Sequence, residues 1–156
     1  MKGNDGSGNM PERDEWQTPQ ELFDKLNKQY NFSFDCCATK ENKKCHYYSS
    51  DFLKIISTLS VMNVAWMNPP FSKAYKMFEH FFESVQQGVS IYRCDNMETK
   101  LWQDVILINA TWILIPKGRI CYEGFEGKGS RFPSALIGFN VTVPEYVSGS
   151  LLMVNK

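Results

Sequence analysis

Three stretches of the chain repeat apolar residues at intervals of three and four positions, which is the spacing of one face of a helix. The repeating positions are Leu22, Phe23, Leu26 and Tyr30; Ala74, Phe78, Phe81, Phe82 and Val85; and Leu101, Trp102, Val105 and Ile106. Thr18-Pro19-Gln20-Glu21 reads as a capping box before the first helix, with Pro19 at the first helical position. Gly88 is expected to end the second. The pattern therefore predicts three amphipathic helices.

Short apolar runs between these stretches predict strands. They cover residues 32–34, 64–67, 89–92, 112–115, 119–122 and 135–139, with 141–143 continuing the last. Strands that alternate with helices favour an α/β fold with a mostly parallel sheet and helices on both faces, and the closely spaced later strands predict an antiparallel edge. Ligands bind beyond the carboxyl ends of such strands. Asp35 and Asn68-Pro69-Pro70-Phe71 each follow a strand, so we expect them to share a cleft.

Composition and charge restrict the class of protein. The 156 residues are 43% hydrophobic and 14% aromatic, which is enough for the core of one domain. Residues 1–13 are rich in Gly, Asn, Ser and charge and are expected to form a disordered tail, which leaves a single domain over residues 14–156. The 17 basic residues balance 17 acidic ones, so any contact with nucleic acid is expected to come from a local patch.

Cysteine usage and hydropathy indicate the compartment. The five cysteines form no Cys-x-x-Cys pair, and Cys36, Cys37, Cys45 and His46 lack the spacing of a zinc site, so we expect no metal. The first residues contain no apolar stretch typical of a signal peptide, and no run approaches the roughly 20 apolar residues that span a bilayer. We therefore expect a cytoplasmic protein with reduced thiols and no membrane contact.

The tetrapeptide Asn68-Pro69-Pro70-Phe71 carries the clearest chemistry. The exocyclic amine of adenine is a poor nucleophile because its lone pair is delocalised into the ring. Two acceptors, the side-chain carbonyl of Asn68 and the main-chain carbonyl of Pro69, would draw that nitrogen toward tetrahedral geometry. The prolines fix the acceptors before substrate arrives, and Phe71 offers a ring on which an extruded base stacks. Two prolines that simply end a strand are the alternative.

Six segments occur in the order seen in one enzyme family. They are Asp14-Glu15-Trp16-Gln17-Thr18-Pro19, Phe34-Asp35-Cys36-Cys37-Ala38, Glu41-Asn42 with Cys45, Asn68-Pro69-Pro70-Phe71, Lys117-Gly118-Arg119-Ile120 and Phe132-Pro133-Ser134-Ala135. Over most of residues 14–140 the chain resembles phage-type DNA N6-adenine methyltransferases of the Dam-like family. The resemblance implies a Rossmann-like class I methyltransferase fold, S-adenosylmethionine as methyl donor and adenine in DNA as substrate. It also implies a bacterium or a phage-infected cell as the setting, where protection of phage DNA from restriction fits the family.

The resemblance assigns roles to particular residues. The catalytic tetrapeptide matches Asn68, Pro69, Pro70 and Phe71. The segment that closes over the methionine end of the cofactor matches Trp16, Gln17, Thr18 and Pro19. Asp35 matches an acid that accepts the ammonium group of the cofactor, and Asp51 an acid that meets its adenosine; a strand-end turn and a helix cap are the respective alternatives. Cys36 and Ala38 stand where methyltransferases usually carry glycines, so the methionine tail is expected to meet Ala38 and the backbone there.

Contact with DNA is expected near a glycine-rich loop, residues 123–130. The candidates for a phosphate-binding patch are Lys117, Arg119, Lys128 and Arg131. Phe125 is a candidate wedge for the space that a flipped base leaves, and a solvated loop with scattered charge is the alternative. No segment is long enough for a separate target-recognition domain, so we expect a short or loose sequence preference. The expected state is a monomer or a weak homo-oligomer.

Three other functions fit part of the sequence. Asn-Pro-Pro before an aromatic residue also serves protein-glutamine N5 methyltransferases, but these carry a glycine-rich first motif that this chain lacks. The N4 amine of cytosine presents the same geometry as that of adenine. A non-catalytic descendant that binds S-adenosylmethionine or DNA is favoured by the missing glycines and opposed by the intact tetrapeptide. Identification of the methylated nucleoside and the affinity for S-adenosylmethionine separate these cases.

Overall fold

The computed structural model describes residues 16–55, 64–123 and 132–155, and its centre is a seven-stranded sheet of order β2-β1-β3-β4-β6-β5-β7. The strands are β1 (Phe34–Asp35), β2 (Tyr47–Tyr48), β3 (Ala65–Met67), β4 (Gly88–Arg93), β5 (Trp112–Pro116), β6 (Ser134–Phe139) and β7 (Gly149–Met153). β2, β1, β3 and β4 pair in parallel, whereas β6 lies antiparallel between β4 and β5. β7 adds an antiparallel edge strand beside β5. The tail expected over residues 1–13 lies outside the described residues.

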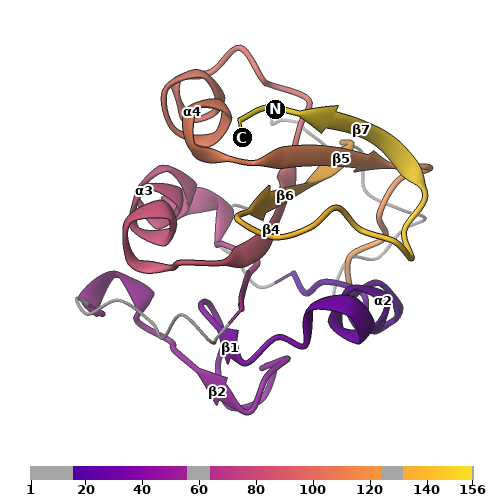
Figure 1. Ribbon diagram of the computed structural model, residues 1–156. Coiled ribbons are helices and arrows are strands. Elements are labelled where there is room, and N and C mark those ends of the chain that lie inside the picture. Colours follow the sequence, from indigo (N-terminus) through magenta and orange to yellow (C-terminus); the bar gives the residue numbers. More distant parts are fainter. Residues whose placement is uncertain (1–15, 56–63, 124–131, 156) are drawn as a thin grey trace, which may run out of the picture.

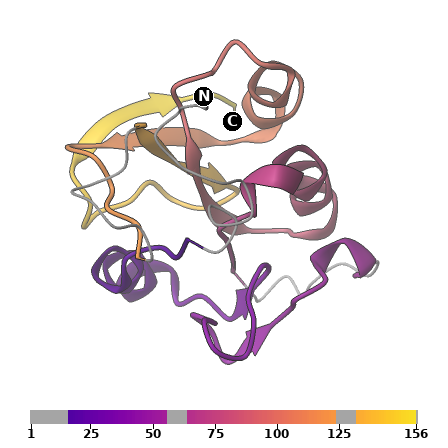
Figure 2. The ribbon, with the colours of Figure 1, turned by 180° about the vertical axis from the view of Figure 1, so that it is seen from behind.

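Helices cover both faces of this sheet. They are α2 (Gln20–Tyr30), α3 (Ala74–Ser84) and α4 (Leu107–Asn109), with a π-helix, η3 (Leu101–Ile106), that runs directly into α4, and two 3-10 turns, η1 (Phe52–Lys54) and η2 (Phe71–Lys73). Both views of the ribbon place α3 and α4 on one side and α2 on the other (Figures 1 and 2). This arrangement confirms the mixed α/β fold with helices on both faces.

Strand residues alternate between two cores, because successive side chains of a strand point to opposite faces. The core on the α3 side includes Met67, Ile113, Ala135, Phe78, Phe81 and Trp102. The core on the α2 side includes Trp66, Ile91, Trp112, Leu136, Phe23 and Leu26. Gly138 of β6 leaves room for the buried Trp112 ring, since a Cβ atom there would lie 2.0 Å from Trp112 Cε2. Burial on both faces is typical of strands in a sheet covered by helices on both sides.

The end of β5 departs from the expected pattern. Residues 119–122 form no strand, because Gly118, with a φ of 77°, turns the chain after β5. Glu123 makes only an isolated bridge, with Gln17. Asn140 adopts a φ of 58°, also in the left-handed region, and follows the end of β6, so residues 141–143 do not continue that strand. The antiparallel edge is therefore built from residues 149–153, where no strand was expected.

Helix boundaries also differ in part from those expected. α3 ends at Ser84, and Gly88 is the first residue of β4 rather than the end of the helix. The capping box at Thr18 is wrong: Pro19 is the N-cap of α2, and the Thr18 hydroxyl is buried with no hydrogen-bond partner among the described residues. The amide of Gln20 donates instead to the Glu123 carboxylate (2.9 Å), 103 residues further along the chain. A negative charge suits this end of a helix.

Candidate functional site

The carboxyl ends of β1 and β3 lie side by side at the point where the strand order of the sheet reverses. β2 lies on one side of β1, whereas β3 and all later strands lie on the other. Open α/β sheets bind ligands at such a switch point. Two neighbouring clefts open there, and Cys37, Asn42 and Asn68 line both of them. Asp35 and Asn68 line the same cleft, which confirms the expectation that these two strand ends share one.

The smaller cleft is polar and the larger one is partly apolar. The smaller has an empty volume of about 350 Å³, and its remaining lining residues are Trp16, Gln17, Thr18, Asp35, Lys44 and Trp66. The larger has an empty volume of about 740 Å³, and its remaining lining residues are Cys36, Ala38, Thr39, Ser50, Phe52, Pro70, Lys73 and Met77. Both volumes include space that is open to solvent.

Asp35 places a buried carboxylate in the smaller cleft. The residue is 2% exposed; its Oδ1 accepts a hydrogen bond from the Cys37 amide (3.2 Å) and its Oδ2 one from the Lys44 amide (2.9 Å). Burial raises the pKa of Asp35 to about 6, although these two amides and the charge of Lys44 oppose the rise. The two amide hydrogen bonds are those expected of a carboxylate in a turn at the end of a strand. Because burial disfavours the ionised form of Asp35, a cationic ligand group bound beside it would stabilise that form.

Asn68 follows β3 with its side-chain amide oriented by a neighbour. Nδ2 donates a hydrogen bond to the main-chain carbonyl of Trp16 (3.1 Å). A carbonyl oxygen only accepts, so the NH2 group must face Trp16 and Oδ1 must face away from it. The strand end is fixed by the Ser90 hydroxyl, which donates to the Met67 carbonyl (2.7 Å). Asn68 Oδ1 is therefore held in a set direction before any ligand binds.

The two prolines place a second acceptor next to Asn68. Pro69 is buried, and the Pro70 carbonyl accepts a hydrogen bond from the Lys73 amide (3.1 Å) at the start of a 3-10 turn. Among the described residues, no donor reaches the Pro69 carbonyl or Asn68 Oδ1. Two adjacent oxygens at the carboxyl end of β3 thus have unused capacity to accept hydrogen bonds.

Phe71 lies in a group of aromatic rings. Its ring centroid is 6.4 Å from that of Trp16, 5.5 Å from that of Tyr92 and 5.5 Å from that of Phe132, each in an edge-to-face arrangement. The Arg93 guanidinium carbon lies 6.0 Å from the Phe71 centroid. Phe71 lines neither of the two clefts, although Pro70, which precedes it, lines the larger one.

The segment before α2 is joined to the chain that follows β5. The main chains of Gln17 and Glu123 exchange two hydrogen bonds (2.9 and 2.8 Å), and the Trp16 ring stacks on Phe132 with centroids 6.3 Å apart. Trp16, Gln17 and Thr18 line the smaller cleft, whereas Pro19 lines a separate cleft beside α2. Three of the four residues of the expected cofactor segment therefore line the same cleft as Asp35.

Cysteines replace the glycines that usually follow the first strand of a methyltransferase. Cys36 and Ala38 line the larger cleft, and the Cys37 sulfur lies 3.9 Å from that of Met77. Burial raises the pKa of both Cys36 and Cys37, so the two thiols are neutral and pack as small apolar groups. Within residues 16–55, 64–123 and 132–155, no three or more His, Cys, Asp or Glu side chains gather as metal ligands would.

Asp51 does not line either cleft. Its carboxylate pairs with Lys54 (3.4 Å) in the exposed turn η1, and it makes no side-chain cap. Its neighbours Ser50 and Phe52 line the larger cleft instead. Asp51 thus stands at the N-cap position of η1 without a capping hydrogen bond from its side chain, and its cofactor role remains a prediction.

Two of the expected DNA-contacting residues follow β5. Lys117 and Arg119 are exposed and line a third cleft, of about 990 Å³, together with Lys25 and Tyr146. β5 runs parallel to β4, because both are antiparallel to β6, so this cleft lies toward the same edge of the sheet as Asn68. Phe125, Lys128 and Arg131 lie outside the described residues.

Sequence reasoning missed several residues of the site. The polar ones are Asn42, Lys44, Ser50 and Lys73, and the apolar ones are Phe52 and Met77. Asn42 could have been predicted, because it belongs to the segment Glu41-Asn42 that resembles the family. The others carry no local signal, since an apolar residue that lines a cleft has the same spacing as one in the core. Arg93 contacts the rings of Phe71 and Phe132, and Glu123 accepts from the Gln20 amide; these partners are distant in sequence, so the local pattern does not reveal them.

Comparison with known families agrees with this geometry. No described helix is both long and apolar enough to cross a membrane. A search of curated proteins gives no match. The sequence matches the family described as DNA N-6-adenine-methyltransferase (Dam) over residues 7–134, which include both strand ends and all lining residues of the two clefts. The chain therefore belongs to the DNA N-6-adenine-methyltransferase (Dam) family.

Proposed function

We propose that this protein transfers a methyl group from S-adenosylmethionine to the N6 amine of an adenine that is flipped out of DNA. The observation that carries the proposal is the pair of acceptors at the end of β3. The Trp16 carbonyl orients the Asn68 amide, and the Pro69 carbonyl lies next in the chain. Such a pair fits an amino group with two N–H donors, because each N–H finds one oxygen.

The acceptors act on the nucleophile. Hydrogen bonds from both N–H groups of adenine to Asn68 Oδ1 and the Pro69 carbonyl draw the amine nitrogen toward tetrahedral geometry, so its lone pair becomes available. Because Pro69 and Pro70 fix the backbone and Trp16 fixes the amide, little reorganisation is needed when the base arrives. Preorganised dipoles of this kind contribute most to transition-state stabilisation.

The residues around the smaller cleft fit the methionine end of S-adenosylmethionine. Thr18 is 1% exposed, and its buried hydroxyl lacks a hydrogen-bond partner among the described residues, which suits a polar ligand group. Asp35 offers a carboxylate to the ammonium group. Phe52 and Met77 in the larger cleft offer apolar contact to the adenosine. When bound, S-adenosylmethionine supplies a methyl group activated on a cationic sulfur.

The topology supports a Rossmann-like class I methyltransferase fold. Five strands run in one direction, with β6 reversed between β4 and β5, and the proposed site lies beside β1 and β3. In this arrangement the cofactor residues follow β1 and the catalytic tetrapeptide follows β3. The two chemical roles thus come from neighbouring strand ends.

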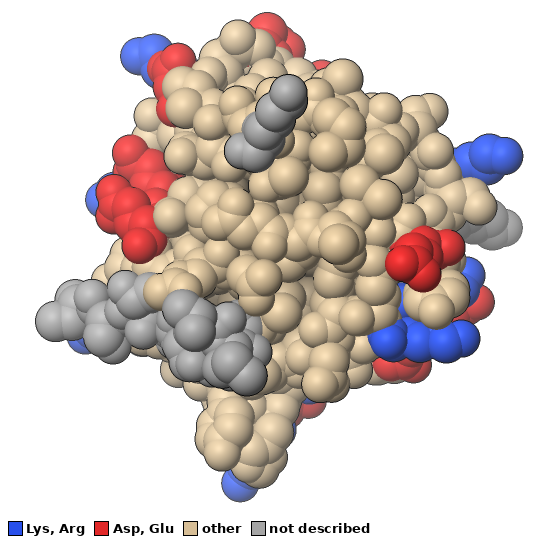
Figure 3. All heavy atoms as spheres, viewed as in Figure 1, with Lys and Arg blue, Asp and Glu red and all other residues tan. Residues whose placement is uncertain are grey.

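Contact with DNA is proposed at Lys117 and Arg119, with Phe71 as the stacking surface for the base. The two cations share a cleft with Lys25, which supports a local phosphate contact. On the face seen in Figure 3, Lys and Arg atoms lie in small separate groups at the rim, some of them beside Asp and Glu atoms, and the middle carries neither. A local contact rather than a broad basic surface also agrees with the zero net charge.

Incubation of the protein with methyl-labelled S-adenosylmethionine and DNA, followed by nucleoside analysis, tests the proposal. Label in N6-methyladenine is the expected result. Label in N4-methylcytosine, or in protein glutamine, would replace adenine by one of the alternative acceptors. Calorimetry with S-adenosylmethionine then separates an inactive binding protein, which takes up the cofactor without transfer, from a protein that does not bind it.

A further inference from the structure

Arg93 lies at the same edge of the sheet as the tetrapeptide. It is the last residue of β4, which pairs in parallel with β3, and the register Met67↔Ser90 carries the end of β4 beyond Asn68. Its side chain is only 11% exposed. A charged group that is this buried needs fixed partners.

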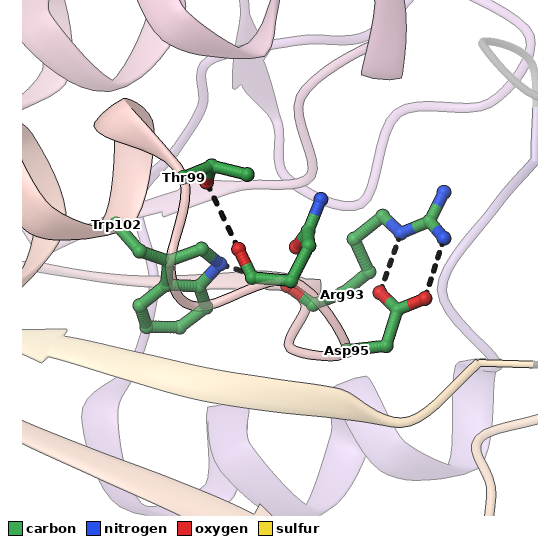
Figure 4. A network of polar contacts seen from close by, with 5 residues as sticks. Arg93, Asp95, Thr99 and Trp102 are labelled. Carbon is green, nitrogen blue, oxygen red and sulfur yellow. Dashed lines mark hydrogen bonds and ion pairs between the residues drawn. The ribbon is translucent and has the colours of Figure 1, made fainter.

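The partners of Arg93 hold its guanidinium in one plane. Nε and Nη2 donate to the two oxygens of Asp95 (2.8 and 2.7 Å), a bidentate pair, and these bonds hold the pKa of Asp95 below its usual value. The Trp102 indole donates to the Arg93 carbonyl (3.2 Å), and Thr99 donates to the Asn96 carbonyl (2.9 Å). Figure 4 shows how this turn presents the carboxylate of Asp95 to the guanidinium of Arg93.

The fixed guanidinium contacts the aromatic group around Phe71. The guanidinium carbon of Arg93 lies 4.5 Å from the centroid of Phe132 and 6.0 Å from that of Phe71. Both distances fall in the range of cation–π attraction. The rings of Phe71 and Phe132 are themselves 5.5 Å apart, so Arg93 and Phe132 restrain Phe71 together.

We propose that Arg93, clamped by Asp95, is a positioning residue that fixes the Phe71 ring for stacking with the flipped adenine. The inference rests on the proposed function. The bidentate pair with Asp95 occupies the guanidinium, so that Arg93 acts on Phe71 as a fixed, flat and charged contact rather than as a cation that pairs with phosphate. Loss of the clamp therefore weakens retention of the extruded base and leaves S-adenosylmethionine binding intact, since neither cleft at β1 and β3 includes Arg93.

Duplexes in which 2-aminopurine replaces one adenine at a time provide the test, because this base fluoresces when it leaves the stack and needs no methyl transfer. Arg93→Met is expected to reduce the fluorescence rise on binding at least fivefold and to raise KM for DNA at least tenfold. Its Kd for S-adenosylmethionine should stay within twofold of that of the wild type. Arg93→Lys, which keeps the charge, should restore part of both signals. Lys76→Met, exposed on α3, is the control.

Wild-type fluorescence and KM in Arg93→Met would overturn the inference. Parallel losses of S-adenosylmethionine affinity and thermal stability would overturn it as well, because they mark a purely structural role. Should Arg93→Met fail to fold, Asp95→Asn carries the same test, since it loosens the guanidinium without removing it. Failure of the proposed function is seen separately, as absence of N6-methyladenine with the wild-type protein.

Discussion

The side-chain amide of Asn68 donates a hydrogen bond to the main-chain carbonyl of Trp16 over 3.1 Å. This bond joins the proposed catalytic tetrapeptide to the segment that lines the smaller cleft. It also leaves Oδ1 of Asn68 facing away from Trp16, where it can accept a hydrogen bond from a substrate. The orientation of one acceptor is thus set by a residue 52 positions earlier in the chain.

Asn68→Ala is expected to reduce methyl transfer at least about 100-fold, because it removes one of the two preorganised oxygens. The affinity for S-adenosylmethionine should change by only a few fold, since Asp35 and Thr18 remain in the smaller cleft. Filter-binding assays with labelled cofactor and calorimetry measure the two quantities. Asn109→Ala, at the exposed end of α4, is the matched control. Equal activity in wild type and Asn68→Ala would refute the assigned role.

Affinity for S-adenosylmethionine is expected to fall as the pH drops below about 6. Burial raises the pKa of Asp35 to about 6, so the carboxylate that is proposed to meet the ammonium group becomes protonated in this range. Calorimetric titrations between pH 5 and 8 measure the change, with Asp35→Asn as the comparison. The variant should bind weakly and with little dependence on pH. A wild-type affinity that is constant over this range contradicts the assignment.

The same pKa makes a prediction for stability without cofactor. The folded-state pKa of Asp35, about 6, lies above the ordinary value of 3.8 for an aspartate, so between these values the folded protein holds a proton that the unfolded chain lacks. The contribution of Asp35 to the free energy of unfolding therefore rises as the pH falls from about 6 to about 4, by at most about 3 kcal/mol. Urea unfolding at several pH values should show this component in the wild type and not in Asp35→Asn.

Thr18→Val is expected to leave the free energy of unfolding unchanged or to raise it slightly. The substitution keeps the shape of the side chain and removes a buried hydroxyl with no partner among the described residues. Glu123→Ala, in contrast, removes the acceptor of the Gln20 amide and should cost about 1 kcal/mol. Thermal melts of the two variants give the comparison. If Thr18→Val were the less stable of the two, Thr18 rather than Glu123 would be the cap of α2.

Replacement of both Lys117 and Arg119 by Met is expected to weaken DNA binding on all sequences alike. If each contacts one phosphate, the slope of log K against log salt concentration falls in magnitude by about 2. S-adenosylmethionine affinity should not change, since neither residue lines the first two clefts. Fluorescence anisotropy at several salt concentrations measures the slope. An unchanged slope would place the phosphate contacts elsewhere.

Long, strongly patterned elements were predictable from the sequence. α3 follows from the helical spacing of its apolar residues, and the central strands β4 and β6 follow from short, nearly continuous apolar runs, because both faces of these strands are buried. The strand predicted over residues 119–122 is wrong for a physical reason. Ile120 and Tyr122 are buried and Cys121 is exposed, which is the alternation of a strand. The segment nevertheless packs on Trp16 without a partner strand. β7 was missed because all its residues are exposed, so no alternation of apolar and polar residues indicates it.

The sequence predicted those residues of the candidate site that lie at the end of a predicted strand. Asn68 stands out because it follows β3 and Asp35 because it ends β1, and their common cleft follows from the parallel pairing of these two strands. The orientation of Asn68 by Trp16 and the contact of Arg93 with Phe71 and Phe132 depend on residues distant in sequence. These do not leave a periodic signal in the sequence.

The reversed direction of β6 determines where this fold can vary. Its first residue, Ser134, pairs with Arg93, the last residue of β4, so the chain that joins β5 to β6 both leaves and re-enters the sheet at the edge of the tetrapeptide. Because β5 and β6 are antiparallel neighbours, extra residues between their ends would add only a small entropic cost. An insertion at this position would therefore leave the strands that hold Asn68 and Asp35 unchanged.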